Sequence, residues 1–193
     1  MRELKTPRGL ARAHVHGVDD ARALLVLGHG AGGGVTAPDL QTATKVALDR
    51  NVRVALVEQP YRVLGRRSPP PALHLDEAWV AVVEQLRDDL PLVVGGRSSG
   101  ARVACRTATE VGAAAVLCLA FPLIAPRGVS RQPELDAVTV PMLVVQGARD
   151  RFGMPTATKL RTVAEVSADH ALKSDRVAVA NAIDGWLADQ LDR

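Results

Sequence analysis

The residues Gly96-Arg97-Ser98-Ser99-Gly100 constrain the fold of this chain most strongly, because two glycines flank a serine where a strand gives way to a helix. Just before them, Leu92 to Val94 form a short apolar run typical of a strand buried on both faces. A Gly-x-Ser-x-Gly sequence in this context holds its serine on a sharp, strained turn. A side chain at either glycine would collide where strand and helix cross. The segment therefore predicts a strained strand-to-helix turn centred on Ser98.

A serine can also occur incidentally in a glycine-softened turn, so its partners along the chain decide between the two interpretations. A second glycine-rich stretch, residues 28–34, follows an apolar strand predicted over residues 23–27. Glycines there allow backbone N–H groups to face a cavity, which suits an anion or an oxyanion. No Gly-Lys-Ser/Thr follows, so the stretch does not match a phosphate-binding loop. We predict that His29, directly before Gly30, shapes this loop rather than acting as a base.

The remaining pattern predicts a single domain over residues 1–193. Apolar strands alternate with helical segments, which indicates an α/β fold with a doubly wound, mostly parallel sheet of six to seven strands flanked by helices. Further strands are expected at 11–16 on an edge, 52–57, 114–120, 141–146 and 162–166. Helices are expected at 38–50, 75–86, 99–109, briefly from Pro155, and near 179–187. Prolines and Gly128 leave little room for a helix in residues 122–139.

Binding sites in such sheets gather beyond the carboxyl ends of the strands, where Ser98, the glycine stretch, Asp150 and His170 are all expected. The net charge is +3, with 24 basic residues scattered among 21 acidic ones, which argues against a nucleic-acid partner. Cys105 and Cys118 are predicted to be buried and reduced.

No metal or cofactor is expected, since the cysteines have no metal-ligand spacing and His14 and His16 have no apparent third ligand and are predicted to face solvent. The sequence holds no signal-type h-region and no apolar stretch of membrane-spanning length. We therefore expect a cytoplasmic protein with no membrane partner.

Four motifs together resemble the α/β-hydrolase superfamily, more narrowly its small lidless members near the dienelactone-hydrolase-like branch. They are His29-Gly30-Ala31-Gly32, Gly96 to Gly100, Gly147-Ala-Arg-Asp150 and Asp169-His170. The order of serine, acid and histidine agrees with that superfamily, and the resemblance extends from about residue 23 to 190. It implies the minimal hydrolase fold without a cap domain.

The resemblance also implies roles for individual residues. Ser98 would be the nucleophile and His170 the base that takes its proton. Asp150 would orient and stabilise the imidazole, whereas the competing Asp169 is predicted to face solvent or cap its loop. The backbone N–H groups of Ser99 and of Ala31 or Gly32 would form the oxyanion hole.

Substrate contacts are expected from residues that follow the strands. Tyr61, Phe121 and Phe152 are predicted to line an acyl or alcohol pocket, with Arg62 beside them. Seven arginines fall on the same edge and suggest an anionic substrate: Arg62, Arg66, Arg67, Arg97, Arg127, Arg149 and Arg151. Since 20 of the 24 basic residues are arginine, an arginine-rich genome that places them on solvated loops explains them equally well.

The leading interpretation is a serine hydrolase that cleaves a small-molecule carboxylic ester or thioester through an acyl-enzyme, as a monomer or homodimer. The alternative is a catalytically silent α/β-hydrolase scaffold that binds a protein or small ligand. A non-hydrolytic use of the site, such as acyl transfer or a lyase reaction, is a third. Dehalogenase chemistry would require aspartate in place of Ser98 and is set aside.

Overall fold

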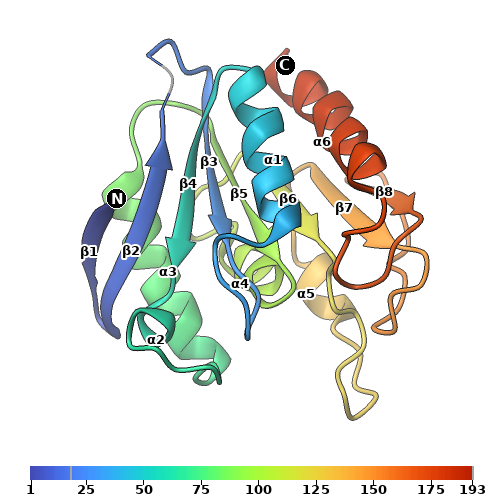
Figure 1. Cartoon of the computed structure of the whole chain (residues 1–193), viewed down its shortest axis with the longest axis horizontal. Helices are drawn as coiled ribbons and strands as arrows, with labels where there is room; N and C mark the ends of the chain where they lie inside the picture. The colour runs from blue at the N-terminus through green and yellow to red at the C-terminus, as the bar shows by residue number, and fades with distance from the viewer. Residues whose placement is uncertain (18, 193) are drawn as a thin grey trace.

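The strands form one twisted sheet in a computed structural model that describes residues 1–17 and 19–192 (Figure 1). Along the sheet their order is β1-β2-β4-β3-β5-β6-β7-β8. In chain order they are β1 (Arg2–Thr6), β2 (Gly9–His16), β3 (Ala23–Gly28), β4 (Val52–Glu58), β5 (Leu92–Arg97), β6 (Ala115–Leu119), β7 (Met142–Gly147) and β8 (Arg161–Val166). All neighbours from β4 to β8 are parallel, and β1 and β2 add an antiparallel edge. The mostly parallel α/β fold is confirmed, with one strand more than the predicted upper number.

The additional strand is β1, which covers the segment predicted to be the sheet edge. Its burial pattern leaves only Leu4 fully buried, because one face of this short strand is open to solvent. A five-residue strand with a single buried side chain has almost no hydrophobic alternation for a sequence pattern to detect. As a result β2 is an interior strand, and its residue His14 has its Nε2 3.0 Å from Glu58 Oε2 on the neighbouring β4.

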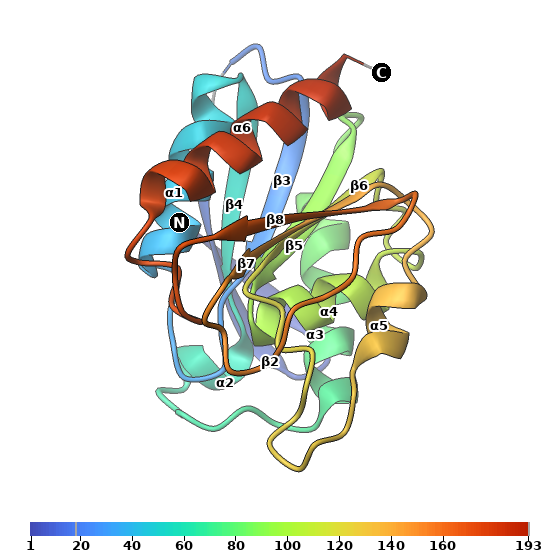
Figure 2. The ribbon, with the colours of Figure 1, turned by 90° about the vertical axis from the view of Figure 1, so that its right-hand side faces the viewer.

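Helices cover both faces of the sheet, as Figure 2 shows with α1 and α6 on one side and α3, α4 and α5 on the other. They are α1 (Pro38–Asp49), α2 (Pro60–Val63), α3 (Ala72–Leu86), α4 (Ser99–Thr107), α5 (Gln132–Asp136) and α6 (Arg176–Leu191). Each face has its own apolar core. Trp79 of α3 is fully buried in the core on its side of the sheet. Over the described residues, no helix is both long and apolar enough to cross a membrane.

Two local predictions were wrong. Residues 122–139 do contain a helix, the short α5, because Pro133 occupies its first turn and Leu135 buries completely against the core. Conversely, Pro155 begins no helix. The Thr158 N–H donates to the Arg161 carbonyl and the Arg161 guanidinium donates to the Thr156 carbonyl, so this segment is tied to β8 in an irregular conformation.

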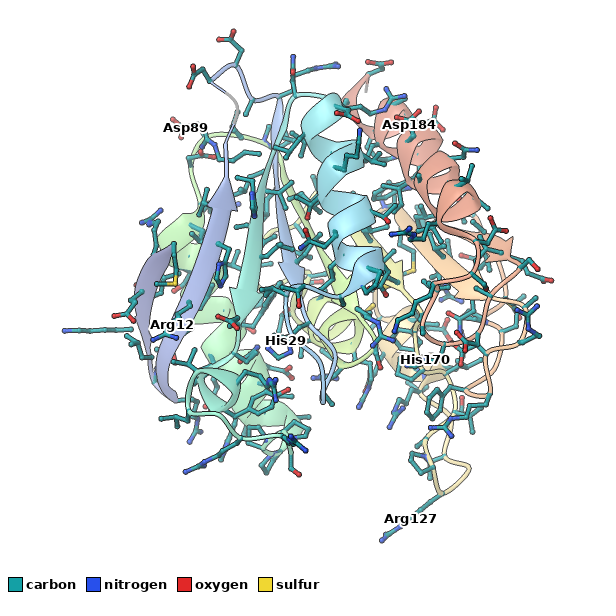
Figure 3. All side chains as sticks on the ribbon, viewed as in Figure 1. Arg12, His29, Asp89, Arg127, His170 and Asp184 are labelled. Carbon is teal, nitrogen blue, oxygen red and sulfur yellow. The ribbon has the colours of Figure 1, made fainter. Side chains whose placement is uncertain are left out.

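The parallel strands bring four chain segments to one edge of the sheet. The glycine stretch follows β3, Ser98 follows β5, Asp150 follows β7 and His170 follows β8. Figure 3 shows the labelled His29 and His170 at this same lower edge, although 141 positions separate them in the sequence. The carboxyl edge therefore carries all the residues that the motifs singled out.

Candidate active site

Ser98 lies on a strained turn between β5 and α4, as the sequence predicted. Its backbone angles are φ 52° and ψ −108°, in a region that residues with a side chain rarely adopt. A Cβ on Gly96 would lie 2.5 Å from the Gly28 carbonyl oxygen, and one on Gly100 only 2.3 Å from the same atom. Both glycines are required because the turn presses directly against the end of β3.

The structure brings Ser98, His170 and Asp150 into one hydrogen-bonded chain. His170 Nε2 lies 3.0 Å from Ser98 Oγ, and His170 Nδ1 lies 2.8 Å from Asp150 Oδ2. Because a carboxylate can only accept, Nδ1 carries the proton and Nε2 is left free to accept from the serine hydroxyl. This arrangement is suited to removing a proton from Ser98.

The Asp150 carboxylate is held from two further sides. Its side chain is fully buried; the Phe152 N–H donates to Oδ1 at 2.9 Å and Gln146 Nε2 donates to Oδ2 at 3.0 Å. The same Gln146 nitrogen also lies within hydrogen-bond distance of the carbonyl oxygens of Phe121 and Gly153. Sequence reasoning missed Gln146; the available signal was a lone polar residue near the end of an apolar strand, four positions before the acid.

The glycine stretch is held in place by the residue predicted to shape it, His29. This side chain is buried, its Nδ1 lies 2.8 Å from the Gly30 carbonyl oxygen, and its Nε2 accepts from the Gln59 N–H at 3.1 Å. These partners require a proton on Nδ1 and none on Nε2. Burial, the largest cause, lowers the pKa of His29, which keeps the ring neutral.

Of the segments predicted to form the oxyanion hole, Ser99 follows Ser98 directly and the glycine stretch approaches it through Gly30. Ser99 is the first residue of α4, so its N–H has no partner within the helix. A Cβ on Gly30 would lie 3.6 Å from Ser98 Cβ, so the loop that continues into Ala31 and Gly32 begins beside the serine. The Ala31 carbonyl accepts from the Tyr61 hydroxyl at 2.7 Å.

The four predicted substrate-contact residues have different surroundings. Tyr61 is buried with its hydroxyl on the Ala31 carbonyl, and burial, the largest cause, raises its pKa to about 12. Arg62 donates to the Arg66 carbonyl. Phe121 is fully buried in the core on the α3 side of the sheet, so the prediction that its ring lines a pocket is corrected: only its carbonyl meets the site, through Gln146.

Phe152 lies directly at the site. Its ring stands edge-on to the His170 ring with the centroids 4.6 Å apart, and the Arg151 guanidinium lies over its face at 4.8 Å. Phe152 and Arg151 line an open groove of about 480 Å³ together with Ile124, Ala125, Pro126 and Gly128. This groove therefore begins beside His170.

Asp169, the competing acid, and two of the seven edge arginines have surroundings that bear on their predicted roles. Asp169 is exposed and accepts from the Ala171 N–H at 2.9 Å, so it caps its own loop as predicted. Among the edge arginines, Arg127 projects from the loop after β6, well away from the site (Figure 3). Arg97 points inward and is ion-paired.

Comparisons with solved structures support the fold. Est1E from Butyrivibrio proteoclasticus, in a structure with ferulic acid bound, matches with a TM-score of 0.82 at 13% identity, over 100% of each chain. XC6422 from Xanthomonas campestris, described as a serine hydrolase without a lid, has a TM-score of 0.74 at 20% identity, over 96% of this chain and 93% of its own. A dienelactone hydrolase from Anabaena variabilis has a TM-score of 0.75 at 17% identity, over 97% and 95%.

No curated protein matches the sequence. A sequence family described as "Alpha/beta hydrolase domain" does match, over residues 21–179, which is most of the chain. The matched range contains the glycine stretch, the Ser98 turn, Asp150 and His170. The chain therefore belongs to the alpha/beta hydrolase family.

Proposed function

We propose that this protein is a serine hydrolase that cleaves a carboxylic ester or thioester. The observation that carries the proposal is the continuous hydrogen-bonded chain from Ser98 Oγ through the His170 ring to the buried Asp150 carboxylate. A serine hydroxyl is a weak nucleophile unless a base takes its proton, and a neutral imidazole oriented by a carboxylate does so.

In the first half of the reaction, His170 Nε2 takes the Ser98 proton as Oγ attacks the carbonyl carbon. The carbonyl oxygen becomes an oxyanion, held by the N–H of Ser99 and one from Ala31 or Gly32. Such a donor contributes about 3 kcal/mol, and the start of α4 adds a favourable dipole. The imidazolium then gives its proton to the leaving alcohol or thiol, which departs and leaves an acyl-enzyme on Ser98.

In the second half, His170 removes a proton from water as the water oxygen attacks the acyl-enzyme carbonyl. The tetrahedral intermediate collapses, Ser98 Oγ regains a proton from the imidazolium, and the carboxylic acid leaves. Atoms balance, because one water is consumed and one acid and one alcohol or thiol are released.

A small-molecule substrate agrees with the surroundings of the site. The groove of about 480 Å³ beside His170 is open, and its lining joins an aromatic ring, aliphatic side chains and one arginine. The structurally similar Est1E is described with ferulic acid bound and XC6422 as a lidless serine hydrolase, which supports the same class of chemistry here. We further propose that the protein acts in the cytoplasm, as a monomer or homodimer.

Labelling by a fluorophosphonate probe, followed by intact-mass detection, tests the proposal. We expect one adduct per chain, mapped to Ser98, with no labelling of Ser98→Ala and a labelling rate at least about 10³-fold lower for His170→Ala. A positive result leads to a screen of esters and thioesters. If folded wild-type protein takes up no probe, the hydrolase proposal is wrong, and a silent binding scaffold takes its place.

A further inference from the structure

Arg97 is the residue directly before Ser98, and its guanidinium joins three separate segments of the chain. Its Nε lies 2.8 Å from Asp39 Oδ2 at the start of α1. Its Nη2 donates to the main-chain carbonyl of His170 at 3.1 Å. A Cβ on Gly30 would lie 2.9 Å from Nη1, so the glycine stretch of residues 28–34 packs against the same group.

The ion pair with Asp39 is buried, so both charged groups lose much of their hydration when it forms. The Asp39 side chain is fully buried and that of Arg97 is 18% exposed. Burial, the largest cause, raises the pKa of Asp39, and the charge of Arg97 opposes that rise. Because desolvation offsets most of the Coulomb attraction, a buried pair stabilises a fold little more than apolar side chains of the same size would. Stability alone therefore does not explain this pair.

What the pair does provide is a fixed guanidinium beside the nucleophile. Asp39 Oδ1 accepts from the Leu40 N–H at 2.9 Å, so the carboxylate is fixed to the first turn of α1. The ion pair then holds the guanidinium beside this carboxylate, and Nη2 of the same planar group donates to a second acceptor. One of those acceptors belongs to the backbone of the base.

His170 needs such a contact because its loop begins from β8, the edge strand of the sheet. The ring itself is bonded to Ser98 and Asp150, but its backbone meets the Ser98 turn through the Arg97 contact. The distance between base and nucleophile thus depends on a short path from the His170 carbonyl through the guanidinium to the peptide bond of Ser98.

We propose that Arg97 is a positioning residue, which docks the His170 loop and the start of α1 onto the Ser98 turn and so sets the distance from base to nucleophile. The proposal rests on the proposed serine hydrolase function. It also explains why an arginine at the edge of the site faces inward rather than toward an anionic substrate.

Arg97→Lys is the decisive variant. The lysine ammonium keeps the charge and can pair with Asp39, but it lacks the planar fork that reaches the carboxylate and the His170 carbonyl together. We expect the maximal rate of fluorophosphonate labelling to fall about 10- to 100-fold, with an unchanged half-saturating probe concentration. The melting temperature should fall by no more than about 4 °C.

Arg102→Lys is the matched control. Arg102 lies one turn into α4 and forms a two-bond ion pair with Glu134, and its side chain is 23% exposed, close to the value for Arg97. Its guanidinium faces α5 rather than the His170 loop. Arg102→Lys should therefore label at the wild-type rate, whatever it does to stability.

Hydrogen–deuterium exchange separates this proposal from the proposed function. In Arg97→Lys, peptides covering residues 167–175 should exchange faster than in wild type, while the same peptides in Arg102→Lys should not. This measurement needs no turnover, so it decides the docking role even if wild-type protein fails to label. Unchanged exchange in this loop, or an unchanged labelling rate in a wild type that does label, overturns the proposal.

Discussion

Two histidines at the same edge of the sheet show how their partners decide their roles. His29 is buried and its ring nitrogens meet a backbone carbonyl and a backbone N–H. His170 is partly exposed and its ring nitrogens meet a hydroxyl and a carboxylate. In both, the proton belongs on Nδ1, so the tautomer is the same. What differs is the group presented to Nε2, a backbone amide that cannot react or a serine that can.

The comparison extends to the loops that carry them. The loop after β3 is fixed by contacts that hold backbone groups, since His29 holds Gly30 and Tyr61 holds the Ala31 carbonyl. The loops after β7 and β8 are organised around one side chain, the Asp150 carboxylate, which has bonds from Gln146, Phe152 and His170. The first region therefore fixes backbone groups, whereas the second fixes a carboxylate and the imidazole bonded to it.

Exchanging each histidine for alanine should produce the largest contrast. His29→Ala leaves the Gln59 N–H without its acceptor, leaves the Gly30 carbonyl with only the Gly33 N–H, and opens a cavity. We therefore expect a loss of about 2–4 kcal/mol in the free energy of unfolding. His170→Ala should change that quantity by less than about 1 kcal/mol and instead lower the labelling rate at least about 10³-fold. Urea unfolding of both variants tests this, and equal losses would show that the two histidines are not distinct in role.

A smaller effect is expected from Gln146→Met, which removes one donor from Asp150 at similar side-chain volume. With less support for the carboxylate, the maximal labelling rate should fall about 10-fold, as is usual for residues that orient a reactive group. The half-saturating probe concentration should not change, because Gln146 lies behind the acid and not in the groove. A shift confined to that concentration would show instead that Gln146 acts through the groove.

The sequence predicted those parts of the site that depend on local backbone requirements. The Ser98 turn followed from Gly96 and Gly100. Both positions lie too close to the end of β3 for any side chain, so the turn requires glycine there, and glycine is visible in the sequence. The positions of Asp150 and His170 followed from the strands before them, since parallel strands end at one edge. The role of His29 followed from its place beside Gly30.

The sequence could not predict contacts that depend on where a side chain points. Phe121 and Phe152 both follow strands, yet one ring turns into the core and the other against His170. The Arg97 ion pair joins residues 58 positions apart, and hydrophobic periodicity contains no information about such a pair. The same reason explains why Gln146 was missed, because its acceptors come from two separate loops, after β6 and after β7.

The smallest effect that we expect is a pH dependence of the free energy of unfolding that comes from His29. The pKa of His29 is lowered in the folded protein, whereas the unfolded chain has the ordinary value of about 6.5. Just below that pH, His29 binds a proton in the unfolded chain but not in the folded protein. The stabilisation from a neutral His29 is therefore present above about pH 6.5 and is lost as the pH falls toward the folded pKa, by at most about 1.4 kcal/mol per pH unit.

His29→Gln tests this linkage, because the glutamine oxygen can replace Nε2 as the acceptor for the Gln59 N–H but does not titrate. We expect the free energy of unfolding of wild type to fall more steeply than that of His29→Gln between about pH 6.5 and 5. Urea unfolding at half-unit pH steps measures both curves. Parallel curves would mean that His29 accepts a proton in the folded state as easily as in the unfolded one, and the loop after β3 would then hold a second titrating histidine beside the catalytic edge.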